Sequence, residues 1–130
     1  MLDYQLASIY LGGIMHLGWA GFHLLFPRLF RWGQRLEPLD PVNQGIMRIM
    51  NLCLTYYFLA AAFLSLYWAE DLLDTDLGQQ ILALLAAFWL LRLGLQLSYF
   101  RATHQTSMLL SLLFLLSAAA YAFPFLYGGS

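Results

Sequence analysis

Lysine is absent from this sequence, and charged residues of any kind are scarce. Of its 130 residues only 10% are charged and 62% are hydrophobic, and all six basic residues are Arg. A typical soluble domain has roughly 45–50% apolar and about 25% charged residues. A soluble domain of this length has too small an interior to bury so many apolar side chains. The composition therefore excludes an ordinary soluble domain and favours an integral membrane protein.

Cysteine and the common catalytic motifs are also missing or nearly so. Cys53 is the only cysteine, which excludes an intrachain disulfide and a cysteine-based metal cage. There is no glycine-rich nucleotide-binding loop and no Ser-His-Asp type array, and nucleic acid is not expected as a partner. No cleavable signal peptide is expected either, because Asp3 stands where such a peptide carries basic residues.

Four apolar segments are long enough to cross a bilayer as helices, since a hydrocarbon core of ~30 Å needs ~20 apolar residues. They are residues 4–26, 45–69, 79–100 and 106–127. Pro27 is expected to end or bend the first helix, and a short interfacial helix is expected before Pro38. Because the connections are short, we predict an all-α, four-helix transmembrane bundle whose consecutive helices are antiparallel neighbours.

The two ends of this bundle differ in charge. Basic residues flank the first and third connections: Arg28, Arg31, Arg35, Arg48 and Arg101. The opposite end carries only acidic residues: Asp3, Glu70, Asp71, Asp74 and Asp76. Basic residues resist translocation and stay cytoplasmic, so both termini are predicted on the non-cytoplasmic side of a bacterial inner membrane. The basic connection is also a place where anionic lipid headgroups would bind.

Small residues predict where helices approach closely. Helix 45–69 has Ala61, Ser65 and Ala69 at four-residue spacing, and helix 4–26 is rich in glycine, Gly12 and Gly18 among them. These faces serve packing within one chain or a seam between copies. Because four short helices enclose little volume, a homo-oligomer or a place in a larger membrane complex is expected.

Three ionisable residues lie inside the predicted spans: His16, His23 and Arg92. Such residues are costly in a membrane and usually functional. No Asp or Glu lies in any span, which argues against a proton antiporter driven by a carboxylate. At ~1.5 Å per residue, the topology places His16 and Arg92 at a similar depth near the middle of the membrane.

A second polar layer is predicted nearer the cytoplasm. It holds His23, Asn51 and Gln96, with Thr55 and Ser111 close by. Three helices thus carry a polar stripe in the same half of the bilayer. Turning these stripes toward one another satisfies their hydrogen bonds, whereas turning them toward lipid leaves them unpaired. Any function is therefore expected in the cytoplasmic half of the bundle.

The individual residues keep alternative roles at this point. His16 either bonds a backbone carbonyl or ligates haem iron or another metal, since neutral imidazole ligates well. His23 is either solvated at the interface or part of a binding site. Asn51 and Gln96 form interhelical hydrogen bonds or contact a ligand. Arg92 either bonds backbone carbonyls and Asn51 or holds an anion such as a phosphate, a lipid headgroup or a haem propionate, which its planar fork suits.

One stretch resembles a known family. The run from Trp19 to Phe30, WAGFHLLFPRLF, resembles the W-x-A-G…L-P-R-L-F stretch of the small four-helix, haem-dependent protoporphyrinogen oxidases of bacteria. The resemblance implies haem b, a mid-membrane histidine at His16 and a basic residue near Arg92. That family has a lysine on its third helix where this chain has Arg92, and arginine cannot ligate iron because it stays protonated.

Three functions follow as hypotheses. The first is a membrane redox protein in which His16 ligates haem b or bonds a quinone, while Arg92 holds a propionate or polarises a carbonyl. The second is an accessory or assembly subunit of a membrane complex, which the short loops suit. The third is a small transporter or channel for anions or other solutes, because an arginine without acidic partners favours anions.

Overall fold

The computed structural model describes residues 2–100 and 104–127, so Arg101 lies outside the described residues. The described part of the chain is helical except for its connections, which confirms the all-α prediction. The helices are α1 (Leu2–Leu29), α2 (Trp32–Arg35), α3 (Pro41–Tyr67), α4 (Ala69–Asp74), α5 (Asp76–Tyr99) and α6 (Gln105–Tyr127). The short helix expected before Pro38 is α2.

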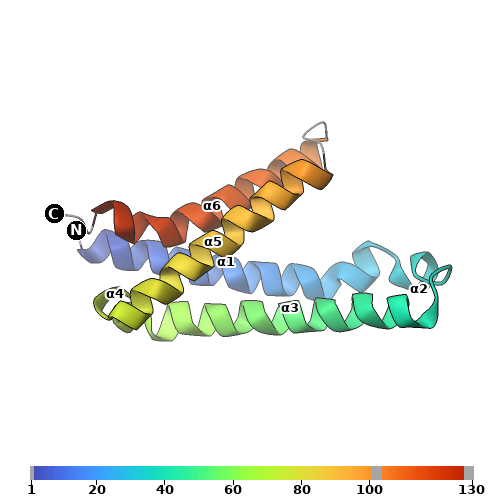
Figure 1. Ribbon diagram of the computed structural model, residues 1–130, viewed down its shortest axis with the longest axis horizontal. Helices are drawn as coiled ribbons and strands as arrows, with labels where there is room; N and C mark the ends of the chain where they lie inside the picture. The colour runs from blue at the N-terminus through green and yellow to red at the C-terminus, as the bar shows by residue number, and fades with distance from the viewer. Residues whose placement is uncertain (1, 101–103, 128–130) are drawn as a thin grey trace.

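Four of these helices, α1, α3, α5 and α6, are long and apolar enough to cross a membrane. Figure 1 shows them as two antiparallel hairpins, α1 with α3 and α5 with α6. Helix α1 also packs against α6. At the end that holds α4, where α1 begins and α6 ends, the hairpins lie together, and toward α2 they diverge (Figure 1). Which end faces the cytoplasm stays a prediction.

The second spanning helix begins four residues earlier than predicted, at Pro41 rather than residue 45. Asp40 has extended backbone angles, and its Oδ1 accepts hydrogen bonds from the backbone N–H groups of Val42 at 3.0 Å and Asn43 at 3.1 Å. A carboxylate at this position satisfies free N–H groups of the first turn. Proline at the first helical position loses no bond, since its N–H would have been free there. Pro41 therefore starts the helix.

The cap at Asp40 gives a pH-dependent prediction. Hydrogen bonds from Asn43, first from its side chain and then from its backbone, hold the pKa of the Asp40 carboxyl below its ordinary value of 3.8. Because the folded-state pKa is lowered, the ionised carboxyl contributes to stability above about pH 4, and this stability is lost as the pH falls through the lowered pKa. We expect Asp40→Ala to lower the melting temperature in detergent at pH 7, with the gap to wild type closing below pH 3.8.

Asp40→Asn, which keeps a capping oxygen without the charge, is the control and should retain most of the stability at pH 7. A gap for Asp40→Ala that persists unchanged into acid would contradict the assignment.

Pro27 was expected to end or bend the first helix; it does not end it, because α1 continues through Pro27 to Leu29. A proline inside a helix has no N–H for the carbonyl four residues earlier, which here is the carbonyl of His23. Asn51 of α3 supplies the missing donor: its Nδ2 lies 2.9 Å from the backbone oxygen of His23. The neighbouring helix therefore compensates for the proline.

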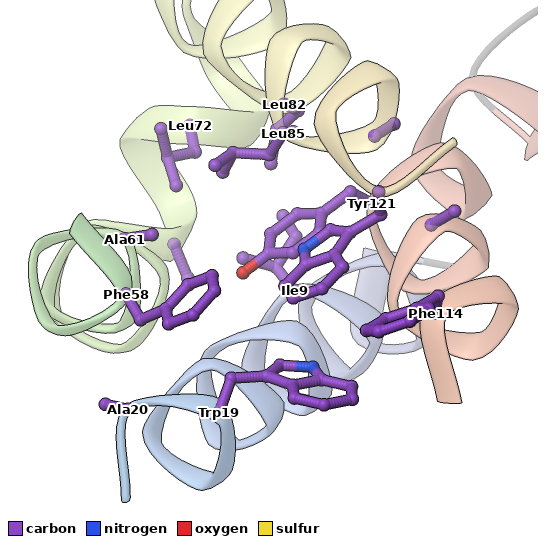
Figure 2. Packing of buried hydrophobic residues seen from close by; sticks show 14 residues of the cluster. Ile9, Trp19, Ala20, Phe58, Ala61, Leu72, Leu82, Leu85, Phe114 and Tyr121 are labelled. Carbon is purple, nitrogen blue, oxygen red and sulfur yellow. The ribbon is translucent and has the colours of Figure 1, made fainter. Parts of the chain in front are cut away.

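A layer of aromatic rings joins the hairpins where they begin to diverge. The ring of Trp19 stacks on Phe114 at 4.9 Å between centroids and lies 5.3 Å from Trp89. Trp89 is in turn stacked on Phe58 at 5.6 Å. Figure 2 shows Trp19, Phe58 and Phe114 reaching inward from α1, α3 and α6. Helices α3 and α5 meet through these large rings instead of a close backbone approach, which keeps the two hairpins apart on one side of the layer.

The small-residue pattern of this segment is confirmed, since Ala61 and Ser65 of α3 and Ala69, the first residue of α4, are all buried. On α1 it divides. Gly12 lies so close to Tyr121 of α6 that a Cβ there would be 2.5 Å from the Tyr121 Cζ, while Gly18 has nothing within 4 Å of such an atom. Of these two glycines, only Gly12, at the closed end of the bundle, is in close contact with another helix.

Candidate functional site

The diverging hairpins enclose a cleft of about 570 Å³, a volume typical of small-molecule sites. Its walls come from all four long helices and are mostly aromatic. The lining residues are Trp19, Phe22, His23, Phe26, Phe30, Leu54, Phe58, Phe88, Trp89, Arg92, Gln96, Phe100, His104, Thr106, Ser107, Leu110 and Phe114. Three of the five predicted site residues, His23, Arg92 and Gln96, therefore lie around one cavity.

His23 and Asn51 hold each other in a fixed orientation, and their predicted proximity is confirmed. Asn51 Nδ2 donates to the His23 carbonyl at 2.9 Å, so Asn51 Oδ1 must be the atom that faces His23 Nδ1, also at 2.9 Å. An oxygen can only accept, so Nδ1 carries the proton and, in the neutral ring, Nε2 carries a lone pair. A histidine held at Nδ1 in this way presents its other nitrogen for a ligand or a metal.

Arg92 brings positive charge to the cleft. Its guanidinium carbon lies 4.4 Å from the centre of the Phe114 ring, a cation–π contact. The four predicted spans contain no Asp or Glu, so no carboxylate of these segments can neutralise it. A half-buried arginine on an aromatic wall is a suitable donor for an oxygen atom of a ligand.

Gln96 lies on the opposite wall from the His23–Asn51 pair and bonds within its own hairpin. Its Nε2 donates to the Ser107 hydroxyl of α6 at 3.2 Å. The hydroxyl proton of Ser107 is directed to the Phe100 carbonyl at 3.3 Å, so Ser107 can only accept from Gln96. The Gln96 Oε1 atom is buried and has no hydrogen-bond partner within residues 2–100 and 104–127. The side chain as a whole is 2% exposed.

His16 lies outside the cleft, completely buried in the closed half of the bundle. Its Nδ1 is 3.0 Å from the Gly12 carbonyl and 2.8 Å from the Tyr121 hydroxyl. Ser65 donates to the Ala61 carbonyl at 2.8 Å, so it accepts from Tyr121 at 2.7 Å. Nδ1 is therefore the donor in the neutral ring. Nε2 is buried and has no hydrogen-bond partner among the described residues.

Aromatic rings separate His16 from the cleft. Its ring centroid lies 5.3 Å from Trp89 and 5.8 Å from Phe58, both of which line the cleft. Arg92 follows Trp89 by one helical turn and lines the cleft itself. The similar depth predicted for His16 and Arg92 therefore does not bring them into one cavity.

Sequence reasoning did not identify Tyr121 and Ser65 as polar partners of His16. Tyr121 lies in an apolar run of α6, where a tyrosine is expected to be an interfacial or packing residue. It is instead fully buried, and its hydroxyl is hydrogen-bonded to both Ser65 and His16. The available signal was Gly12, one turn before His16, which gives the tyrosine ring its space. Thr55, expected near the polar layer, donates to the Asn51 carbonyl of its own helix.

Metal binding by side chains alone has little support in this bundle. Within residues 2–100 and 104–127 no group of three or more His, Cys, Asp or Glu side chains could hold a metal ion. Cys53 is exposed on α3. A metal would therefore have to arrive in a larger group that supplies most of its ligands, as haem does.

Comparison with known proteins identifies no family for this chain. No family model, no curated protein and no solved structure matches it. The fold and the site define a small four-span membrane protein with buried polar residues.

Proposed function

We propose that this chain is a membrane redox protein that binds a flat, largely apolar cofactor, haem b or a quinone, in the cleft between its two hairpins. The observation that carries the proposal is the combination of aromatic walls with an arginine that no carboxylate of the spans can neutralise. Flat ring systems stack on aromatic side chains. Carboxylate or carbonyl oxygens on the rim of such a ring would accept hydrogen bonds from Arg92.

For haem b, the cleft residues fit the group through His23 and Arg92. The Asn51 carboxamide fixes the His23 ring with Nε2 unprotonated, which is the form that binds iron. Arg92 would pair with a propionate. Bound haem would supply one-electron chemistry, with its potential set in part by the apolar surroundings. His16, the position implied by the resemblance to the haem-dependent oxidases, lies behind Phe58 and Trp89.

An absorption spectrum of protein purified from haem-replete cells tests the haem form. We expect a Soret band in wild type, its loss in His23→Ala, and at least a tenfold weaker haem affinity in Arg92→Leu, about 1.4 kcal/mol. Loss of the band in His16→Ala but not in His23→Ala would place iron at His16 instead. Variants are compared at equal recovery of the monodisperse peak in size-exclusion chromatography, so that misfolding is not read as lost binding.

The quinone form has its own test. Organic extracts of the purified protein are assayed for co-purified quinone, and duroquinone is titrated into the protein by calorimetry. A colourless preparation that contains no quinone and takes up no duroquinone discards the redox proposal. The accessory-subunit and transporter hypotheses would then be the remaining predictions.

A further inference from the structure

The buried oxygen of Gln96 indicates one group that a ligand of this cleft should carry. Gln96 lines the cleft, and its amide orientation is fixed because Ser107 can only accept from Nε2. Its Oε1 is buried, and no donor for it lies in the part of the chain that the structure describes. Leaving a buried acceptor unpaired is costly, and a ligand that supplies a donor recovers that cost. The best-matched ligand therefore carries an O–H or N–H group.

Arg92 indicates a second group on the ligand, an acceptor oxygen. It lies one turn before Gln96 on α5, and both line the same cavity. Four residues correspond to a rise of ~6 Å along the helix. Arginine has only donors, so it requires an acceptor oxygen on the ligand. One wall of the cleft thus offers the donors of Arg92, and one helical turn further the Gln96 Oε1 lies buried beneath the same wall, so that it accepts from a ligand only when the Gln96 side chain turns toward the cavity.

The third feature is shape. The rings of Trp19, Phe58, Trp89 and Phe114 lie within 4.9–5.8 Å of one another in stacked or tilted pairs at the inner end of the cleft. All four residues line it. Such a surface favours a flat, substituted ring over a flexible chain, because a rigid ring loses little conformational freedom when it binds.

From these three features we infer that the cleft prefers the hydroquinone form of a quinone couple, with one ring hydroxyl donating to Gln96 Oε1 and a ring oxygen accepting from Arg92. The inference rests on the proposed function and specifies the ligand of that site. A hydroquinone has both donors and acceptors on a flat ring. The oxidised quinone has two carbonyl oxygens and no donor, so it pairs with Arg92 but leaves Gln96 Oε1 unsatisfied.

A preference between the two forms changes the redox couple. A site that binds the reduced form more tightly makes the bound quinone easier to reduce. Recovery of one buried acceptor corresponds to a preference on the order of tenfold. For a two-electron couple a tenfold preference raises the midpoint potential of the bound form by about 30 mV. The cleft would therefore hold the bound quinone couple at a slightly higher potential than the free couple.

The test is anaerobic calorimetry of the full chain in detergent with three probes of one shape. They are tetramethyl-1,4-hydroquinone, duroquinone and the dimethyl ether of the hydroquinone, which has no O–H. We expect wild type to bind the hydroquinone about tenfold more tightly than either other probe. Gln96→Leu should bring the three affinities within about twofold of one another while duroquinone binding remains, which also shows that the variant is folded.

Gln79→Leu is the matched control, since it makes the same change on the same helix outside the cleft, where Gln79 bonds only the Leu73 carbonyl. It should keep the wild-type preference. Equal affinity of wild type for hydroquinone and duroquinone overturns this inference and leaves the proposed function standing. Failure of all three probes to bind overturns the inference together with the quinone form of the proposed function. A preference that survives Gln96→Leu overturns the assignment to Gln96.

Discussion

Gly12→Ala should destabilise the bundle by about 1–3 kcal/mol, as overpacking of a tight contact does. The added Cβ would lie 2.5 Å from Cζ and 2.9 Å from Oη of Tyr121. The Tyr121 ring cannot turn aside without cost, because it is fully buried and its hydroxyl is bonded to both Ser65 and His16. The change is measured as the free energy of unfolding in a titration of sodium dodecyl sulfate against mixed micelles.

Two other glycines on the same helix serve as graded controls. At Gly13 a Cβ would lie 2.8 Å from Cγ of Leu66, a partly exposed and flexible side chain, and 3.0 Å from Cβ of the buried Ser65, so the contact is tight but less so than at Gly12. At Gly18 a Cβ would meet nothing within 4 Å. The expected loss of stability is therefore large for Gly12→Ala, smaller for Gly13→Ala and absent for Gly18→Ala. Equal effects at the three positions would show that α1 and α6 do not meet as described.

Asn51→Leu is expected to cost about 1–2 kcal/mol, because it removes two hydrogen bonds in a medium that offers few replacements. The carbonyl of His23 would then have no donor from either side, since Pro27 lacks an N–H. The His23 ring would lose the partner of its Nδ1 as well. Binding of any ligand at His23 should weaken in parallel, which the spectrum or calorimetry of the same variant measures.

Pro27→Ala provides a specific rescue. An alanine at position 27 restores the backbone N–H that the His23 carbonyl lacks, so the double variant Asn51→Leu with Pro27→Ala should be about 0.5–1 kcal/mol more stable than the sum of the single effects. This double-mutant cycle separates the compensation of the proline from general packing around Asn51. Strictly additive effects would mean that Asn51 does not substitute for the missing N–H.

The sequence was sufficient for the parts of this structure that follow from residue spacing and membrane depth. Long apolar runs predict the four spanning helices, and equal depth predicts that His23 and Asn51 meet. Helix starts were less predictable, because Asp40 and Thr75 begin α3 and α5 through side-chain oxygens that accept from the first turn. Pro27 was expected to end or bend a helix, whereas it lies inside α1, and Pro41 is the first residue of α3.

The cleft could not be read from spacing, because it depends on the angle between two hairpins. That angle is set by how the large rings of Trp19, Phe58 and Trp89 stack, and periodicity does not record ring stacking. The same limit explains why His16 and Arg92 were assigned to one site. Their predicted depths are similar, but the rings of Trp89 and Phe58 stand between His16 and the cavity.

The aromatic layer has a mechanical consequence for α5. Tyr99, at the end of the helix, lies ten residues after Trp89. The part of α5 beyond the layer, which remains paired with α6 through Gln96 and Ser107, is therefore ~15 Å long at 1.5 Å per residue. A rigid tilt of about 10° about Trp89 would displace the tip of that part by about 3 Å. A small change in ring packing at the aromatic layer would therefore produce a larger displacement at the mouth of the cleft.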